Sequence, residues 1–146
     1  MMFQHKVAVI TGGVQGIGKC IGEEFQKNGA SVCIIDKQPN EYFTGDVADK
    51  ETLHRFAEKV IADYGYVDYL INNALPLMKG ISHCSYEEFN YALQVGVAAP
   101  FYLTKLFLPY FAPGAAIVNL SSSRDRMSQP QTESYIAAKG GIAALT

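Results

Sequence analysis

Two side chains near the end of the chain could carry out acid–base chemistry together. Tyr135 and Lys139 are four residues apart (139 − 135 = 4), and on a helix residues at this spacing lie side by side. An ammonium about 4 Å from a phenolate stabilises it by about 4 kcal/mol at an effective dielectric of 20. Tyr135 is therefore a candidate general acid for carbonyl reduction and general base for alcohol oxidation. A buried tyrosine beside a surface lysine has the same spacing, so the interpretation needs further residues.

Ser122 is the first of those residues. It lies 13 positions before Tyr135 (135 − 122 = 13), in a serine run that closes an apolar, strand-like segment. Its hydroxyl could hold the substrate oxygen while a cofactor carries the hydride. Together, Ser122, Tyr135 and Lys139 form the candidate catalytic set.

A glycine-rich segment near the start could bind the hydride carrier. Residues 11–18 read TGGVQGIG and follow an apolar run at residues 6–11. A strand, a glycine turn and a helix in this order direct backbone N–H groups and the positive end of the helix dipole toward one point. Gly12 permits the tight turn, Gly16 lets the backbone approach a pyrophosphate, and Gly18 allows close packing of helix and strand. The candidate phosphate-binding residues are Gly12, Gln15, Gly16, Ile17 and Gly18.

An acidic residue ends the next strand-like segment. Asp36 lies 18 positions after Gly18 (36 − 18 = 18), where a carboxylate can bind the ribose hydroxyls of an adenosine. A carboxylate also repels a 2′-phosphate, which favours NAD over NADP as the cofactor. Lys37 argues in the other direction, because an ammonium could tolerate that phosphate. The alternative is that Asp36 only terminates a strand at a turn.

Strand-like and helix-like segments alternate along the chain. Apolar and β-branched runs predict strands at residues 6–11, 31–36, 41–44, 67–72 and 115–120. Helical periodicity predicts helices at residues 16–28, 49–64, 85–111 with a kink near Pro100, and from Glu133 onward. Asp49 and Ser85 are the expected N-caps. The alternation predicts an α/β fold, a Rossmann-like doubly wound parallel sheet with three layers, in a single NAD(P)-binding domain over residues 1–146.

Two details of this arrangement are less direct. Only residues 37–40 separate the second and third strands, whereas a parallel crossover needs a dozen or more residues. The third segment is therefore either a short edge strand reached by an extended loop or not a strand. In the first helix, Ile17, Ile21 and Phe25 form one apolar stripe at helical spacing.

Composition excludes several classes of partner. The formal net charge of −2 gives no reason to expect nucleic acid or an anionic membrane. The three cysteines lack CxxC spacing, so neither disulfides nor a metal site is expected, and a reducing cytoplasm is the predicted location. Residues 89–111 carry one charge, Lys105, and could pass for a membrane span. Their polar residues and prolines fit a buried helix better.

These motifs resemble those of the short-chain dehydrogenase/reductase family over nearly the whole chain. The glycine turn resembles TGxxxGxG, residues 72–74 the family's NNA, and residues 119–122 and 135–139 its serine and YxxxK motifs. The resemblance implies that Asp46 and Val47 flank the adenine. It implies that Asn73 and Ala74 fix the central strand and the cofactor, and that Lys139 bonds the nicotinamide ribose. It further implies a homodimer or homotetramer formed by the two helices that begin near Ser85 and Glu133.

Three departures from the family pattern stand out. Leu75 replaces the glycine of NNAG and places a bulky side chain beside the expected cofactor. Gly96 aligns with the family's catalytic asparagine, which would hold a water on the proton path. The chain stops at Thr146, while members of the family have about 250 residues, the usual range for one α/β domain. We therefore expect a fragment that lacks the C-terminal strands and leaves the fifth strand as an uncovered apolar edge.

The leading hypothesis is an NAD-dependent oxidoreductase that transfers a hydride between nicotinamide and a small alcohol or ketone, with Tyr135 as general acid or base. A different hypothesis is a non-catalytic dinucleotide-binding or dimer-forming remnant, motivated by Gly96. A third is a relative that uses the same residues for dehydration or epimerisation. The identity of the substrate does not follow from these residues.

Overall fold

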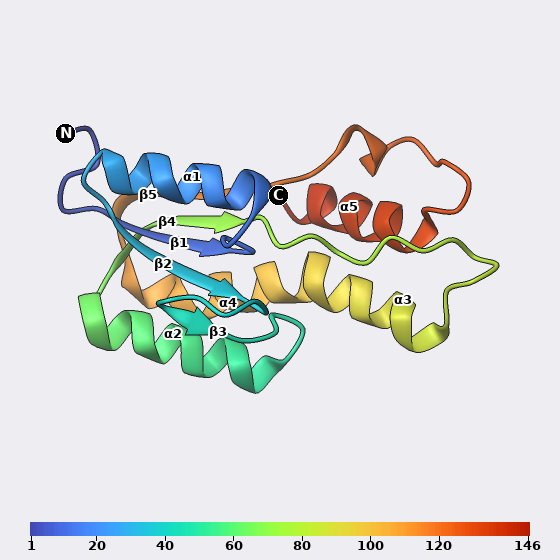
Figure 1. The fold of residues 1–146 in the computed structure, drawn as a ribbon, viewed down its shortest axis with the longest axis horizontal. Helices are drawn as coiled ribbons and strands as arrows, with labels where there is room; N and C mark the ends of the chain where they lie inside the picture. Colours follow the sequence, from blue (N-terminus) through green and yellow to red (C-terminus); the bar gives the residue numbers. More distant parts are fainter.

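Five parallel strands form the centre of the structure, in the order β3–β2–β1–β4–β5 (Figure 1). The computed structural model describes residues Met1–Thr146, the whole of the given sequence. The strands are β1 (Val7–Thr11), β2 (Ser31–Asp36), β3 (Phe43–Thr44), β4 (Val67–Asn72) and β5 (Phe111–Asn119). All pairings are parallel, which confirms the predicted Rossmann-like sheet.

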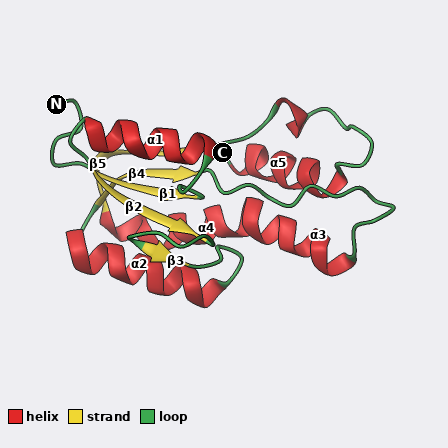
Figure 2. Ribbon diagram, in the orientation of Figure 1, coloured by secondary structure: helices red, strands yellow, loops and turns green.

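Helices cover both faces of this sheet (Figure 2). The helices are α1 (Gly16–Lys27), α2 (Lys50–Tyr64), α3 (Tyr86–Leu93), α4 (Ala99–Phe107) and α5 (Glu133–Leu145), with single turns η1 (Gln94–Ala98), η2 (Leu108–Tyr110) and η3 (Ser123–Asp125). Helix α1 lies on one face of the sheet, and α2 and α4 lie on the other. Helix α5 lies beside α3, beyond the carboxyl ends of the strands.

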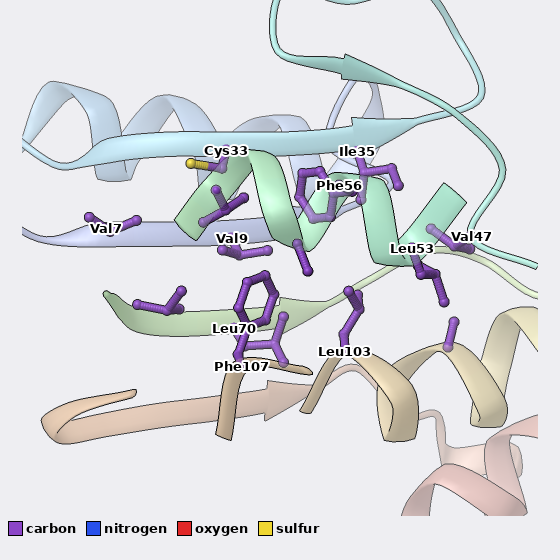
Figure 3. Close-up of a cluster of buried hydrophobic side chains, with 14 of the residues drawn as sticks. Val7, Val9, Cys33, Ile35, Val47, Leu53, Phe56, Leu70, Leu103 and Phe107 are labelled. Carbon is purple, nitrogen blue, oxygen red and sulfur yellow. The ribbon is translucent and has the colours of Figure 1, made fainter. Parts of the chain in front are cut away.

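The main hydrophobic core lies between the sheet and the layer formed by α2 and α4 (Figure 3). Every residue of β1 is buried because β2 and β4 flank it and helices cover both of its faces. Phe56 from α2 and Phe107 from α4 are fully buried against the strands. Burying a side chain of this size stabilises the fold by about 1.5–3 kcal/mol, so these two helices are anchored firmly to the sheet.

Both predicted N-caps are present. The Asp49 carboxylate accepts a hydrogen bond from the backbone N–H of Thr52 at 2.9 Å, and the hydrogen bonds from Thr52 lower the pKa of Asp49. Ser85 accepts from the N–H of Glu88 at 3.1 Å, while the Glu88 carboxylate accepts from the N–H of Ser85 at 3.0 Å. This reciprocal capping box fixes the start of α3.

The apolar stripe of α1 is turned only partly toward the sheet. Ile17 is 66% exposed, and the buried positions of α1 are Gly18 and Gly22. Two glycines four residues apart let the helix backbone approach the strands closely, so the glycine face turns inward. Ile21 and Phe25 are half-buried at the border of this face.

The long helix departs from its predicted form. Pro100 lies in the first turn of α4, where its missing N–H is tolerated. The irregularity is the π-helical turn η1, which begins six residues earlier at Gln94 (100 − 94 = 6). The segment Tyr86–Tyr110 is long and apolar enough to cross a membrane by composition alone, but here it packs on β4, β5 and α2, as a core helix does.

The two edge strands also refine the predictions. Strand β3 has two residues and pairs with the end of β2, which confirms the short edge strand reached by an extended loop. Strand β5 begins at Phe111 rather than Ala115, because its pairing with β4 continues through an irregular register near Val67. Ile117 and Val118 of β5 are 39% and 46% exposed, so this edge is apolar and uncovered, as expected.

Candidate active site

A cleft of about 390 Å³ opens beside the glycine turn. It lies where the strand order reverses, between the carboxyl ends of β1 and β4, which is where parallel α/β sheets bind ligands. Nine of the predicted cofactor residues line it: Gly12, Gln15, Gly16, Ile17, Asp36, Asp46, Val47, Asn73 and Ala74. Gly18, Tyr135 and Lys139 do not line it.

Glycine is required in the turn for two different reasons. Gly16 has a φ of +56° and no atom within 4 Å of where a Cβ would stand, so its backbone is open to the cleft. A Cβ at Gly18 would come 2.3 Å from both the Gly12 carbonyl oxygen and Asn73 Nδ2. Gly18 therefore serves the close approach of α1 to the strands, while Gly16 shapes the surface of the cleft. Gln15, the N-cap of α1, makes no side-chain capping bond, so the first N–H groups of the helix have no side-chain partner.

Asn73 joins the end of β4 to the glycine turn. Its side-chain amide donates to the carbonyl oxygens of Gly12 at 2.7 Å and Thr11 at 3.1 Å. In return, the Thr11 hydroxyl accepts from the backbone N–H groups of Asn73 and Ala74, both at 3.0 Å. These four bonds hold the two strand ends that frame the cleft in a fixed relation.

The Asp36 carboxylate is held in place by backbone donors at the end of β2. One oxygen accepts from the N–H of Val14 at 3.1 Å and the other from the N–H of Gln38 at 3.0 Å. Two ionised oxygens offer about four acceptor sites, so both retain capacity for further donors. Asp36 is therefore oriented beside the glycine turn with room to accept from ribose hydroxyls.

Asp46 is held by a residue that sequence reasoning missed. The Tyr91 hydroxyl, on α3, donates to Asp46 Oδ2 at 2.9 Å and accepts from Lys37 Nζ at 2.9 Å. Tyr91 and Val95 both line the cleft. Tyr91 is 45 residues from Asp46 (91 − 46 = 45), and no local motif marks it. Only the tertiary placement of α3, beyond the carboxyl ends of the strands, brings it there.

On the catalytic side, Tyr135 and Lys139 lie together on α5, as predicted. Lys139 Nζ lies 5.6 Å from the centre of the Tyr135 ring. The lysine is only 5% exposed, and its burial lowers the pKa of the ammonium. Nζ donates a hydrogen bond to the Leu120 carbonyl oxygen, at the end of β5.

Ser122 follows directly after that strand end. Its hydroxyl oxygen accepts from the N–H of Arg124 at 3.2 Å and so caps the short turn η3. The neighbouring Ser121 hydroxyl donates to the Lys139 carbonyl oxygen at 3.3 Å. The segment after β5 is therefore joined to Lys139 twice, once through the lysine side chain and once through its backbone carbonyl. Ser122 lies in this same segment.

The loop after β4 holds the start of α5. The Ser134 hydroxyl donates to the Leu77 carbonyl oxygen at 2.6 Å and accepts from the N–H of Lys79 at 2.8 Å. Ser134 is fully buried. Because Ser134 immediately precedes Tyr135, these bonds fix the start of α5 relative to the strand end that carries Asn73.

Both side-chain departures from the family motifs have a structural counterpart. Leu75 is 71% exposed and lines the cleft, so a bulky side chain does stand at the cofactor side. A Cβ at Gly96 would come 2.7 Å from the Ala138 Cβ and 3.3 Å from Pro76. Glycine at position 96 lets the π-helical turn touch α5, and a larger side chain does not fit there without movement.

Comparison with known proteins agrees with this geometry. Residues 6–146 match the family described as short chain dehydrogenase. The chain belongs to that family. An uncharacterized oxidoreductase of Thermotoga maritima is 34% identical, over 99% of this chain and 64% of that protein. An apo SCOR enzyme from Clostridium thermocellum is 42% identical with a TM-score of 0.89, over 96% of this chain and 63% of that one.

A third comparison bears on the cofactor. A metagenomic short-chain oxidoreductase solved with NADP is 25% identical to this chain, with a TM-score of 0.91 over 99% of this chain and 75% of that one. This structural neighbour thus holds a nicotinamide dinucleotide. The chain spans less than two thirds of the Thermotoga and Clostridium proteins.

Proposed function

We propose that this short-chain dehydrogenase is an NAD-dependent oxidoreductase that interconverts an alcohol and a carbonyl compound. The observation that carries the proposal is the placement of two sites at one edge of the sheet. The cleft opens beside Asn73, after β4, and the Tyr135–Lys139 pair is joined to Leu120, after β5. Strands β4 and β5 are neighbours, and their last residues, Asn72 and Asn119, pair with each other. Both sites therefore begin at the same carboxyl edge of the sheet.

The residues present fit a nicotinamide dinucleotide. The open backbone at Gly16 and the uncapped start of α1 offer N–H donors to a pyrophosphate. Asp36 would accept from the adenosine ribose hydroxyls, and Asp46 and Val47 would hold the adenine. Asn73 and Ala74 would bind the nicotinamide half, and Lys139 would bind the second ribose. When bound, the cofactor supplies the site of hydride exchange.

The proton is handled by the residues of α5. Tyr135 gives its phenolic proton to the substrate oxygen in the reductive direction and accepts it in the oxidative direction. The Lys139 ammonium lies over the ring and favours the phenolate electrostatically. Ser122 uses an oxygen lone pair for the N–H of Arg124, which leaves its hydroxyl hydrogen free to donate to the substrate oxygen.

Substitution of Tyr135 tests the proposal. With NADH and a panel of ketones, Tyr135→Phe should reduce turnover by about 10²- to 10⁴-fold, the usual contribution of a general acid. Its affinity for NADH should stay unchanged because Tyr135 does not line the cleft. Tyr86→Phe is the matched control, since Tyr86 is 78% exposed on α3. Equal turnover by wild type and Tyr135→Phe would refute the acid–base role.

The choice of NAD depends on Asp36. Because its carboxylate is fixed beside the glycine turn, a 2′-phosphate would meet a negative charge there. Asp36→Ala should raise the affinity for NADP relative to NAD, measured by titration of protein fluorescence. An unchanged ratio would remove the role assigned to this carboxylate.

One observation favours a second candidate, a nucleotide-binding protein without turnover. Gly96 has no side chain to hold a water on the proton path. Its close contact with Ala138 also leaves no room for a side chain at this position. Lys139 Nζ also bonds to the Leu120 carbonyl oxygen. Under this hypothesis, wild type binds NADH with normal affinity but shows no ketone-dependent oxidation.

We also propose that the protein forms a homodimer or homotetramer. An apolar groove runs between the long helix and α5 and includes Leu93, Val97, Phe101 and Leu145. Phe101 is 54% exposed there. Covering such a groove with a second copy would remove apolar surface from water. A monomer in light scattering would contradict the proposal.

A further inference from the structure

Lys37, Tyr91 and Asp46 form a closed triangle at the rim of the cleft. Lys37 Nζ donates to the Tyr91 hydroxyl at 2.9 Å, and that hydroxyl donates to Asp46 Oδ2 at 2.9 Å. The third side is the ion pair between Lys37 Nζ and Asp46 Oδ2 at 3.3 Å. The ammonium also lies 5.2 Å from the centre of the Tyr91 ring. The lysine is thus held by two interactions with Tyr91 on α3 and by one with Asp46 in the loop after β3.

Lys37 is the only cationic residue among those that line the cleft. It follows Asp36 in the chain, where a free ammonium could neutralise a phosphate on the adenosine ribose. Its hydrogen bonds to Tyr91 and Asp46 raise its pKa, so the charge is present but already partnered. The formal charge of Asp36, Lys37 and Asp46 together is −1 + 1 − 1 = −1. A further anion therefore meets a rim of net negative charge.

We propose that Tyr91 is a cofactor-specificity residue, which selects NAD by holding the Lys37 ammonium on Asp46 and away from the position of a 2′-phosphate. This inference rests on the proposed function, because it requires the cleft to bind the adenosine half of a dinucleotide. Asp36 supplies repulsion, and Tyr91 withholds the one cation that would offset it. Two residues from different elements would then set a single preference.

The strength of the hold depends on the hydroxyl of Tyr91. The side chain of Lys37 is 64% exposed, and an exposed ion pair with Asp46 alone contributes little. A lysine side chain has a flexible four-carbon stem and three donors, so it moves readily to a new anion once a partner is lost. Removing one hydroxyl should therefore release the ammonium, while the ring of Tyr91 keeps its packing.

The test compares four proteins: wild type, Tyr91→Phe, Lys37→Met and the double variant. Dissociation constants for NAD and NADP are measured by calorimetry on each. Tyr91→Phe should improve NADP affinity relative to NAD by about threefold to tenfold, the equivalent of one net hydrogen bond. In the Lys37→Met background the same substitution should leave the ratio unchanged, since there is no ammonium to release. Tyr102→Phe is the matched control, because Tyr102 lies beside Lys50 but outside this cleft.

The outcomes separate the two proposals. If Tyr91→Phe weakens NAD and NADP equally or leaves their ratio unchanged, Tyr91 only packs against the cleft and the inference is overturned. A ratio that shifts equally with and without Lys37 also overturns it, because the effect would not act through the lysine. If wild type binds neither nucleotide, the proposed function fails, and the specificity role fails with it.

Discussion

The nucleotide side and the catalytic side of the site are built in different ways. On the nucleotide side, four hydrogen bonds of 2.7–3.1 Å join Asn73 and Ala74 to Thr11 and Gly12. The elements involved are the ends of strands in the middle of the sheet. On the catalytic side, Tyr135 and Lys139 share one helix, and a few bonds from Ser134, Ser121 and Lys139 dock that helix.

This difference shows where each side is vulnerable. The nucleotide side depends on the register of β1, β2 and β4 and on how closely α1 approaches them, so a small increase in volume should disturb it. The catalytic side obtains its main geometry from helical spacing, which survives small shifts of the whole helix. Substitutions that change packing should therefore weaken nucleotide binding when they lie on the nucleotide side. On the catalytic side they should instead affect stability or turnover.

Among changes in packing, the largest expected effect comes from Gly18→Ala. The new Cβ would stand 2.3 Å from Asn73 Nδ2 and from the Gly12 carbonyl oxygen. We expect a loss of about 1–3 kcal/mol in the free energy of unfolding, as in other overpacked sites. NADH affinity should fall at least about tenfold, because 1.4 kcal/mol of distortion suffices for that. Urea unfolding and fluorescence titration measure the two quantities.

Gly22→Ala is the matched control on the same helix face. A Cβ there meets Ile10 Cδ1 at 3.5 Å, an ordinary contact. Alanine in a helix should then stabilise the protein by up to about 1 kcal/mol relative to glycine. Equal behaviour of the two variants would show that close approach at Gly18 does not shape the nucleotide side.

Gly96→Ala should disturb the catalytic side, with a loss of stability but no loss of NADH affinity. Its Cβ would lie 2.7 Å from the Ala138 Cβ, which should cost about 1–3 kcal/mol of stability. NADH affinity should be retained because Gly96 does not line the cleft. Ala138→Gly should relieve the clash, so a double-mutant cycle should give a coupling of about 0.5–3 kcal/mol. Strict additivity of the two substitutions would contradict the contact.

A smaller effect is expected for Ser85→Ala at the start of α3. Loss of an N-cap costs about 1 kcal/mol, and the capping box with Glu88 is complete here. Because the cap lies six residues before Tyr91 (91 − 85 = 6), NADH affinity should stay within about twofold if the packing of α3, rather than its cap, positions that tyrosine. Ser128→Ala in an exposed loop is the control. A large loss of affinity would show that the two sides are coupled through α3.

The smallest expected effect is a pH trend from Lys139. Burial lowers its pKa in the folded protein below 10.5, so the unfolded chain binds more protons between the two values. Stability therefore rises with pH through this window, as the cost of burying the charge disappears. The stability of wild type relative to Lys139→Met should therefore increase as the pH rises toward 10.5, measured by chemical unfolding. A difference that is constant with pH would show that the ammonium is not destabilised by burial.

The fold could be predicted from the sequence nearly throughout, because its signals are local. Apolar β-branched runs gave the strands, and Asp49 and Ser85 marked helix starts through short-range capping bonds. The exposure of Ile17 shows what periodicity alone does not tell. An apolar stripe suggests a face that packs inward. Two glycines on another face let the helix backbone approach the sheet more closely, and the spacing of apolar residues does not report the packing that this approach allows.

By itself, the sequence determined the order of the elements, the glycine turn, the acid at the end of β2 and the pairing of Tyr135 with Lys139. Each of these depends on neighbours within a few residues along the chain. Only the tertiary structure decided that Tyr91 reaches Asp46 and that Gly96 touches Ala138. These contacts join residues more than 40 positions apart (91 − 46 = 45; 138 − 96 = 42). Their existence depends on how helices and loops from distant parts of the chain pack against one another, since close packing fixes distances that no local pattern encodes.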